Sequence, residues 1–248
     1  MGKVMLVTGA SRGIGAEIAL LAGRNGYKVG VNYLRSEAAA QAVVAQIRNA
    51  GGEAHALQAD VGQQAEVAAM FQRLDDTLGT VDVLVNNAGV LAMFRVDTAD
   101  ETNVLDVFRA NVFSAFFCSR EAIRRMSTVH GGKGGVIVNM SSVAARLGGL
   151  GGGSAYAASK AAIDTFNLAL AKEVGGEGIR VNAIRPGLIS TEIHAVQGGI
   201  ARMELMAKTA VPLGRAGSPA EVAEVALWLA SDSASYVHGS IVDVAGGR

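Results

Sequence analysis

Short apolar runs alternate with longer amphipathic stretches along the whole chain. Seven runs predict strands, at residues 4–8, 28–33, 54–58, 81–86, 136–141, 180–185 and 240–244. The spacing of apolar residues between them predicts helices near 14–25, 36–50, 63–78, 101–128, 155–175 and 218–231. Continuous apolar strands that alternate with helices are typical of a parallel sheet covered on both faces. The pattern therefore predicts a doubly wound α/β fold with a seven-stranded parallel sheet, whose ligands bind beyond the carboxyl ends of the strands.

Length and composition are those of one large α/β domain. The chain has 248 residues, half of which are apolar, and only three prolines. No Ser/Pro-rich or low-complexity stretch offers a linker. We therefore expect residues 1–248 to form a single domain.

The charge balance narrows the classes of partner. Lys and Arg together number 22, and so do Asp and Glu. This balance gives no electrostatic reason to expect a nucleic acid or an anionic membrane surface as a partner. The first residues lead into an apolar strand without the layout of a signal peptide, and no run of about 18 apolar residues predicts a membrane span. We therefore expect a cytoplasmic protein with a small-molecule substrate.

Cysteine and histidine offer no metal or disulfide chemistry. Cys118 is the single cysteine, which excludes an intrachain disulfide, and its apolar helical surroundings predict a core position. The four histidines, His55, His130, His194 and His238, are scattered along the chain. We expect no metal site.

A glycine-rich segment follows the first predicted strand and opens the first predicted helix. Its glycines, Gly9, Gly13 and Gly15, permit a tight turn, close approach of the backbone to a pyrophosphate, and close packing of helix on strand. Free N–H groups and the helix dipole then favour the negative charge of a phosphate. Placed after strand one of an alternating α/β chain, the segment predicts a dinucleotide site that also includes Ser11 and Ile14.

The end of the second predicted strand bears on the choice between NAD and NADP. An NAD site usually presents an acidic residue about 20 positions beyond the glycine loop, where it binds the ribose 2′-hydroxyl. This region offers Asn32 and Tyr33, with no acidic residue before Glu37. Arg12 and Arg35 have the forked donors that suit a 2′-phosphate, although both also fit as solvated surface arginines. We predict a preference for NADP(H), with NAD(H) possible.

Tyr156 and Lys160 are the most informative pair in the sequence. Four residues apart on a helix, their side chains share one face, with Cβ atoms roughly 5–6 Å apart. The lysine ammonium favours the phenolate and lowers the pKa of the tyrosine toward the range of a general acid–base. Taken alone, the same spacing also fits a tyrosine packed in a core beside a solvated lysine.

Four motifs resolve that alternative. They are Thr8-Gly9-x-x-x-Gly13-x-Gly15, Asn86-Asn87-Ala88-Gly89, Ser142 with Tyr156-x-x-x-Lys160, and Pro186-Gly187. In this order and spacing they resemble the short-chain dehydrogenase/reductase superfamily, and the resemblance spans essentially the whole chain. It implies a Rossmann fold and an NAD(P)-dependent oxidoreductase that acts on a carbonyl or secondary alcohol of a small molecule.

The resemblance also implies roles for individual residues. Tyr156 exchanges a proton with the substrate oxygen, and Lys160 holds the nicotinamide ribose and lowers the tyrosine pKa. Ser142 hydrogen-bonds the substrate oxygen. Asn111 resembles the family asparagine that holds a water in the proton relay beyond the lysine.

Further positions resemble the family's cofactor contacts. Asp60 and Val61 resemble the adenine contact, and Asn87, Ala88 and Gly89 the stretch beneath the adenine ribose. Pro186, Gly187, Ile189 and Thr191 resemble the loop that orients the nicotinamide carboxamide. The predicted helices 101–128 and 155–175 resemble the family's subunit-packing pair, which implies a homotetramer.

Ser142 precedes Tyr156 by one position more than is usual in the family, which leaves Ser141 as a second candidate. The glycine-rich residues 148–153 offer room for the extra residue. Segment 191–211, which contains His194, predicts either a helical lid over the site or a helix packed on the body, with His194 as a lid contact.

Two other functions remain open. Among family members the chain most resembles bacterial oxidoreductases labelled glucose 1-dehydrogenase-like. The first alternative function is that of a 3-oxoacyl-acyl-carrier-protein reductase. Those reductases dock an acidic carrier with basic residues near the active-site entrance, whereas this chain has Glu177 at one such position and Lys133 at the other. The reversed charge at Glu177 disfavours carrier docking. The second alternative is a non-catalytic NADP(H) sensor, which has no need of a proton relay.

Overall fold

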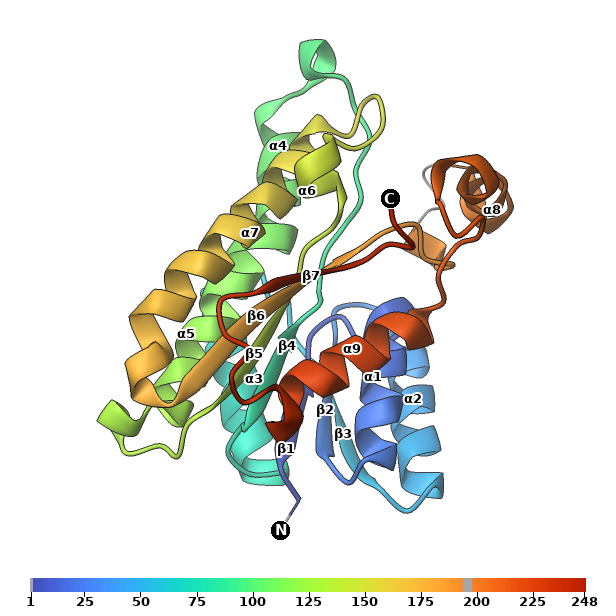
Figure 1. The fold of residues 1–248 in the computed structure, drawn as a ribbon. Helices are drawn as coiled ribbons and strands as arrows, with labels where there is room; N and C mark the ends of the chain where they lie inside the picture. Colours follow the sequence, from blue (N-terminus) through green and yellow to red (C-terminus); the bar gives the residue numbers. More distant parts are fainter. Residues whose placement is uncertain (1, 194–197) are drawn as a thin grey trace.

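A seven-stranded parallel sheet forms the centre of the molecule (Figure 1). The computed structural model describes residues 2–193 and 198–248. The strands are β1 (Val4–Val7), β2 (Lys28–Tyr33), β3 (Glu53–Gln58), β4 (Val83–Asn86), β5 (Gly135–Met140), β6 (Ile179–Pro186) and β7 (Ile241–Val244). Their order in the sheet is β3-β2-β1-β4-β5-β6-β7, with every neighbouring pair parallel. The predicted doubly wound α/β fold is confirmed.

Helices cover both faces of the sheet, as Figure 1 shows. Helices α1 (Gly13–Arg24), α2 (Glu37–Asn49) and α9 (Pro219–Ala230) pack on one face, and α3 (Gln64–Thr77), α5 (Ser114–Met126) and α7 (Ser154–Val174) on the other. Successive strand residues point to opposite faces, so Met5 and Val7 join the first core while Val4 and Leu6 join the second. Burial on both faces is the reason that the strands are apolar without interruption.

Local capping signals fix where α9 begins. The Ser218 hydroxyl accepts a hydrogen bond from the backbone N–H of Glu221, and the Glu221 carboxylate accepts one from the backbone N–H of Ser218. Pro219 occupies the first helical position, where its missing N–H costs nothing. These contacts start the helix one residue after the predicted position, 218.

The long helix predicted over 101–128 is interrupted. Helix α4 (Glu101–Phe108) passes into a π-helical segment, η2 (Arg109–Phe113), before α5 begins. The wider turn contains the buried Asn111, whose amide reaches out of the helix to hydrogen-bond Val90 and Ser159. Apolar periodicity cannot reveal such a turn, because it records which face is buried and not where the backbone hydrogen bonds shift.

Smaller helices lie outside the regular alternation. Helix α6 (Ala144–Leu147) follows β5, and α8 (Gly199–Ala210) falls within the segment predicted to contain a helical lid. Helix α8 buries Met203 and Ala207 against Leu188 and Val211. His194 lies outside the described residues. Four 3₁₀ turns complete the described elements: η1 (Val96–Thr98), η3 (Thr128–His130), η4 (Gly175–Glu177) and η6 (Asp232–Ala234).

The winding direction of the chain reverses between β1 and β4. The chain moves outward from β1 through β2 to β3 and then returns to β4 on the other side of β1. Thr8, just after β1, ties this point together: its hydroxyl accepts hydrogen bonds from the backbone N–H groups of Asn87 and Ala88. The glycine loop and the loop after β4 therefore meet at the switch point, where ligands bind in open α/β sheets.

Candidate active site

The glycine loop has the shape of a phosphate cradle. Gly9 and Gly13 have positive φ angles of 61° and 58°, which residues other than glycine rarely adopt. A Cβ on Gly15 would clash with the Asn87 side-chain nitrogen and lie 2.6 Å from the Gly9 carbonyl oxygen. No side chain caps the N-terminus of α1 at Arg12. The first N–H groups of α1 and the space above them therefore fit a pyrophosphate.

We expect Gly15→Ala to damage this cradle. The new methyl group would push the loop away from Asn87, so the free energy of unfolding should fall by about 1–3 kcal/mol. The dissociation constant of the cofactor, measured by fluorescence titration, should rise at least about tenfold, which corresponds to 1.4 kcal/mol.

Gly26→Ala is the matched control for that variant. Unlike Gly15, Gly26 has a positive φ, of 81°, and a Cβ at this position would meet nothing within 4 Å. Its substitution should cost stability through backbone strain alone and leave cofactor affinity unchanged. If Gly15→Ala bound the cofactor with wild-type affinity, this result would contradict the assignment of the glycine loop as the phosphate site.

A cavity of about 570 Å³ extends from the glycine loop past the end of β2. The predicted cofactor residues that line it are Gly9, Ser11, Arg12, Gly13, Ile14, Gly15, Asn32, Tyr33, Arg35, Asp60, Val61, Asn87, Ala88, Gly89 and Thr191. The structure therefore brings together the glycine loop and the ends of β2, β3 and β4 around one elongated space. Pro186, Gly187 and Ile189 lie elsewhere, in the wall of a neighbouring cavity.

Asn32 uses its side chain within the protein. Its oxygen accepts from the backbone N–H of Gly9, and its nitrogen donates to the carbonyl groups of Leu57 and Ala59. With 1% of its surface exposed, Asn32 fastens the ends of β1, β2 and β3 to each other. Its carboxamide carries no negative charge, and both its donor and its acceptor groups have partners.

The two arginines predicted to bind a phosphate differ in their surroundings. Arg12 lies 3.8 Å from Glu192, and both side chains are largely exposed, so this ion pair is weak. Within residues 2–193 and 198–248, Arg35 makes no ion pair. Both guanidinium groups are therefore available at the cavity that they line.

Ser142, and not Ser141, faces the catalytic tyrosine candidate. The Ser141 hydroxyl is buried and donates to the backbone carbonyl of Lys160, which fixes it inside the protein. The Ser142 hydroxyl accepts from the backbone N–H of Ala144 and hydrogen-bonds Tyr156. Helix α6 follows immediately, so the turn into this helix aims Ser142 at the cavity.

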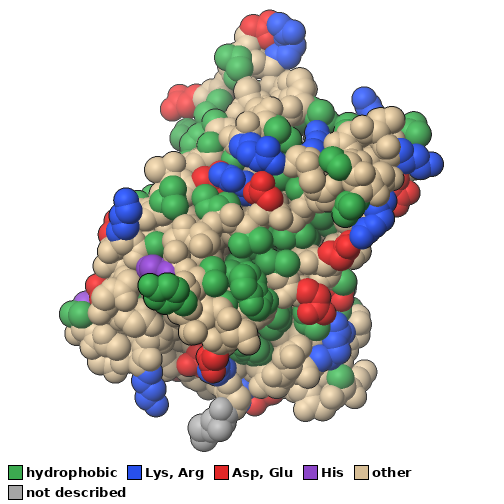
Figure 2. All heavy atoms as spheres, viewed as in Figure 1, with side chains coloured by type: hydrophobic (Ala, Val, Ile, Leu, Met, Phe, Trp, Pro, Cys, Tyr) green, Lys and Arg blue, Asp and Glu red, His purple; other side chains and the backbone are tan. Residues whose placement is uncertain are grey.

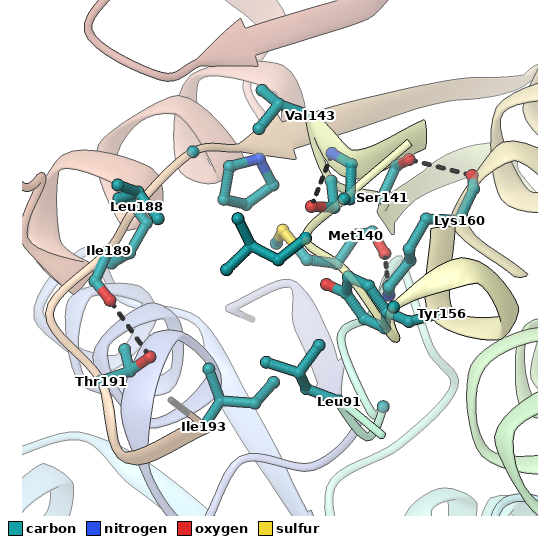
Figure 3. Close-up of a pocket in the computed structure, with 18 of the residues that line it drawn as sticks. Leu91, Met140, Ser141, Val143, Tyr156, Lys160, Leu188, Ile189, Thr191 and Ile193 are labelled. Atoms are coloured by element: carbon teal, nitrogen blue, oxygen red, sulfur yellow. Dashed lines mark hydrogen bonds between the residues drawn. The ribbon is translucent and has the colours of Figure 1, made fainter. Parts of the chain in front are cut away.

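Lys160 is buried beside Tyr156. Its ammonium donates to the Met140 carbonyl at 2.8 Å and lies 5.9 Å from the centroid of the Tyr156 ring. Burial lowers the pKa of Lys160 to about 8, and the nearby Asp164 carboxylate opposes that shift. Figure 3 shows both side chains projecting from α7 toward the cavity.

The pKa of Tyr156 differs from the sequence-based expectation. Burial raises the pKa of the phenol above its ordinary value, and the hydrogen bond with Ser142 acts in the opposite direction. The expectation considered only the lysine charge, whereas removing the phenolate from water is the larger effect here. Tyr156 in the protein alone is therefore a neutral phenol at pH 7.

Asn111 lies against Gly89, a residue that lines both the cavity of the glycine loop and the cavity beside Tyr156. Its carboxamide donates to the Val90 carbonyl and to the Ser159 hydroxyl, and it accepts from the Val90 N–H. A Cβ on Gly89 would lie 2.9 Å from the Asn111 oxygen and 3.5 Å from the Lys160 nitrogen. Asn111 and Lys160 therefore both lie against Gly89. The hydrogen bonds of the Asn111 side chain join η2 to the loop after β4.

Sequence reasoning missed Ser159. Its hydroxyl donates to the Tyr156 carbonyl at 2.7 Å and accepts from Asn111 at 2.9 Å. It lies between the tyrosine and the lysine in the motif, and its position three residues after Tyr156 was the available signal. Ser159 connects η2 to the helix that carries both catalytic candidates.

A second cavity, of about 140 Å³, adjoins the first (Figure 3). Ile14, Asn87, Gly89, Val90, Thr191 and Ile193 line both cavities. Its polar lining includes Tyr156, Lys160 and Ser142 together with Asn87, Ser141, Thr191 and Arg248. Apolar side chains supply most of the rest: Leu91, Met93, Met140, Val143, Leu147, Leu150, Leu188 and Ile193. The sequence indicated that residues after Ser142 and segment 191–211 shape the substrate site, and Val143, Leu147, Leu150 and Ile193 fall there. Leu91, Met93, Met140 and Leu188 were not identified, because they join this wall only in the folded chain.

Comparison with known proteins places the chain in a family. Residues 9–248 match the family described as enoyl-(acyl carrier protein) reductase. The chain is also 48% identical over 246 residues to the uncharacterized oxidoreductase YgfF of Escherichia coli (strain K12), which covers 99% of both proteins. The chain belongs to the short-chain dehydrogenase/reductase (SDR) family. The SDR family implies an oxidoreductase with a nicotinamide cofactor.

Two further relatives extend this placement. The versicolorin reductase stcU of Emericella nidulans is 39% identical over 256 residues, covering 99% of this chain and 95% of that protein. The crystal structure of acetoin dehydrogenase YohF from Salmonella typhimurium superimposes with a TM-score of 0.87 at 33% identity. That comparison covers 100% of this chain and 97% of the other. The SDR fold is therefore shared over the full length.

Proposed function

We propose that this SDR protein transfers a hydride between NADP(H) and a carbonyl or secondary alcohol of a small apolar substrate. The carrying observation is the position of Tyr156 and Ser142 in the apolar cavity, beside the wall shared with the glycine-loop cavity. A proton donor and a hydrogen-bond partner thus face the place where a cofactor and a substrate would meet.

The residues present fit a nicotinamide dinucleotide. The uncapped N-terminus of α1 and the glycine cradle suit the pyrophosphate, and Lys160 lies where its remaining donors can hold ribose hydroxyls. Pro186, Gly187, Ile189 and Thr191 line the cavity next to Tyr156, as expected of a loop that orients the nicotinamide. When bound, the cofactor supplies or accepts the hydride.

Tyr156 is placed to move the proton. In the reductive direction its phenol donates a proton to the developing alkoxide of the substrate, and in the oxidative direction its phenolate removes the hydroxyl proton. Burial raises the tyrosine pKa, so the protonated form predominates at neutral pH. That state favours carbonyl reduction, and oxidation should accelerate as the pH rises.

The residues around Tyr156 hold the reacting groups in place and stabilise the negative charge that develops on the substrate oxygen. Ser142 hydrogen-bonds Tyr156 and is free to share its hydroxyl with the substrate oxygen, which helps to stabilise developing negative charge. Lys160 holds its ammonium against the Met140 carbonyl on the tyrosine side of α7. The hydrogen bonds of Asn111 and Ser159 hold η2, α7 and the loop after β4 together. This arrangement supports a role for these three segments in the proton relay.

The preference for NADP(H) rests on the end of β2. No carboxylate stands where an NAD enzyme would bind the ribose 2′-hydroxyl, and the side chain of Asn32 is committed to the protein. Arg12 and Arg35 both line the cavity, and their guanidinium groups suit a 2′-phosphate.

The substrate class follows from the wall opposite Tyr156. Leucine, isoleucine, valine and methionine side chains dominate this wall, which suits an apolar ketone better than a polyol. The relatives' names support the reaction type, since they describe versicolorin reductases and an acetoin dehydrogenase.

The experiment that tests this function follows the hydride. NADPH deuterated at C4, in each configuration, is incubated with the protein and a panel of apolar ketones. We expect one configuration to place deuterium on the carbinol carbon of the alcohol product. Alcohol formed without deuterium from either configuration would refute direct hydride transfer.

A 3-oxoacyl-acyl-carrier-protein reductase is the second candidate, and the description of the matching family names the same kind of carrier, with an enoyl group in place of a 3-oxoacyl group. Lys133 and Glu177 lie just before β5 and β6, whereas Tyr156 lies in the first turn of α7. From Tyr156 to its end at Val174, α7 rises about 27 Å at 1.5 Å per residue, and Glu177 lies beyond that end. Within one subunit this position is therefore remote from the cavity. Equal kcat/KM for a 3-oxoacyl group on its carrier and on a short thioester would count against carrier docking.

We also infer a homotetramer, because two separate apolar surfaces are exposed. One surface lies on α5 and α7, where Phe116 stacks on Phe166 at 4.2 Å and remains 50% exposed beside Leu168. The other lies over α9 and the edge strand β7, where Trp228 is 42% exposed and Tyr236 fully exposed. Figure 2 shows hydrophobic side chains gathered over this second surface. Two self-complementary surfaces build a tetramer with closed symmetry.

Phe116→Glu should split that tetramer into dimers. The carboxylate would lie unpaired in the first interface, where burying a charge without a partner is costly. Light scattering coupled to size-exclusion chromatography measures the change in mass. Val129→Glu is the control, because Val129 is an isolated exposed residue of η3. A wild-type monomer, or an unchanged tetramer in Phe116→Glu, would contradict the assignment.

A further inference from the structure

A chain of ion pairs runs behind the catalytic candidates. Arg185, near the end of β6, donates to one oxygen of Asp164 on α7 at 2.8 and 2.9 Å. The same arginine lies 3.5 Å from Asp243 on β7, which in turn lies 3.2 Å from Arg146 on α6. The alternating charges thus join α7, β6, β7 and α6, four elements around the apolar cavity.

Asp164 occupies a distinctive place in this chain. It follows Lys160 by four residues on α7, so the two side chains share a helix face. Asp164 is 8% exposed, and its second carboxylate oxygen is buried without a hydrogen-bond partner among the described residues. Arg185 donates to only one of the two carboxylate oxygens, so the other is left in the interior without a hydrogen bond from the described residues, on the helix face that also carries Lys160.

The other groups around Lys160 carry no negative charge. On α7 the neighbour is the neutral Tyr156 phenol, from β5 the Met140 carbonyl, and from η2 the Asn111 carboxamide beyond Gly89. Arg185, from β6, is positive but is held by Asp164 and Asp243. Asp164, one turn further along α7, is the carboxylate that shares a helix face with Lys160, and it raises the pKa of the lysine against the effect of burial.

We propose that Asp164, clamped by Arg185, is a positioning residue that supplies the counter-charge for the Lys160 ammonium. The proposal rests on the role assigned to Lys160, whose ammonium must persist in a nearly dry site in order to hold ribose hydroxyls and attract the phenolate. Burial lowers the pKa of Lys160 to about 8 although Asp164 opposes the shift. The ion pair with Arg185 determines how strongly the Asp164 carboxylate stabilises the Lys160 ammonium.

Two substitutions with opposite charge effects test the proposal. Asp164→Asn keeps the shape of the side chain, removes the negative charge and leaves Arg185 less compensated, so the pKa of Lys160 should fall by about half a pH unit or more. Arg185→Gln removes the positive charge and leaves Asp164 uncovered, so the pKa of Lys160 should rise by a similar amount. Asp243→Asn removes the other carboxylate beside Arg185 and should change the pKa of Lys160 by much less.

The readout is the titration of the Lys160 side chain in the intact protein without cofactor. ¹³C-labelled lysine gives a Cε signal for each lysine, and Lys160→Met assigns the one from position 160. Circular dichroism selects the pH range in which each variant stays folded. Opposite shifts in Asp164→Asn and Arg185→Gln support the proposal. No shift in either variant, or shifts in the same direction in both, would overturn it.

This titration does not depend on turnover. Failure of the proposed oxidoreductase function would appear as absent hydride transfer with the lysine shifts still in place. Failure of the positioning role would appear as unchanged lysine titration in an enzyme that still reduces ketones. In the active enzyme, Asp164→Asn should move the alkaline limb of kcat/KM to lower pH, whereas a purely structural role would lower stability and leave that limb unmoved.

Discussion

Tyr156→Phe should lower kcat for ketone reduction by about 10²–10⁴-fold, the usual contribution of a positioned general acid. The substitution removes only the hydroxyl of a buried side chain, so helix α7 and its packing should survive. The lost group is the one that Ser142 contacts and that faces the substrate cavity. The dissociation constant for NADPH, measured by fluorescence titration, should change little, because the phenol lies at the substrate end of the site.

Tyr236→Phe provides the control for that loss. Tyr236 does not line the cavity, and phenylalanine keeps the ring that belongs to the second apolar surface, so the loss of its hydroxyl should not affect turnover. A Tyr156→Phe variant that kept more than about a tenth of the wild-type kcat would remove the acid–base role from this residue.

Arg12→Ala combined with Arg35→Ala should raise KM for NADPH about a hundredfold and leave KM for NADH within a few-fold. Each arginine would lose a charge-assisted hydrogen bond to the 2′-phosphate, typically about 1.5–3 kcal/mol. NADH has a hydroxyl at that position, so neither guanidinium gains much from it. Parallel steady-state titrations with the two cofactors give the comparison.

Arg95→Ala serves as the control for general charge loss, because Arg95 is exposed and pairs with Asp97 in a remote turn. It should leave both KM values unchanged. If the double variant raised KM for NADPH and for NADH equally, the two arginines would not be the residues that bind the 2′-phosphate.

The fold was predictable because burial on both faces leaves a strong record in the sequence. Every predicted strand exists, and most boundaries agree within a residue. Strand β4 is an exception, since the prediction began at 81 and the strand begins at Val83. The reason is local: the Asp82 side chain accepts a hydrogen bond from the backbone N–H of Val4, and periodicity does not record such side-chain contacts.

The candidate site was predictable where its residues follow strands in fixed motifs. Ser142, Tyr156 and Lys160 meet at one cavity, and the glycine loop meets the loop after β4. The π-helical turn at Asn111, the Ser159 bridge and the Asp164–Arg185 pair were not predicted. Each depends on contacts between elements far apart in sequence, which no single pattern of spacing contains.

Electrostatics showed the clearest limit of sequence reasoning. The spacing of Tyr156 and Lys160 indicated how a charge acts on the phenol, but it contained no measure of burial. In the folded protein burial is the larger influence on both side chains: it raises the tyrosine pKa and lowers the lysine pKa. The proposed preference for carbonyl reduction at neutral pH rests on that balance.

The central claim is that the chain is an NADPH-dependent carbonyl reductase rather than a protein that only binds the cofactor. The most direct measurement is stopped-flow oxidation of NADPH and of NADH, side by side, over a panel of apolar ketones, with cofactor affinity determined on the same sample. The account predicts tight NADPH binding and enzyme-dependent oxidation by at least one ketone, faster with NADPH than with NADH at equal concentration. NADPH binding without turnover of any ketone would contradict it and would indicate a sensor.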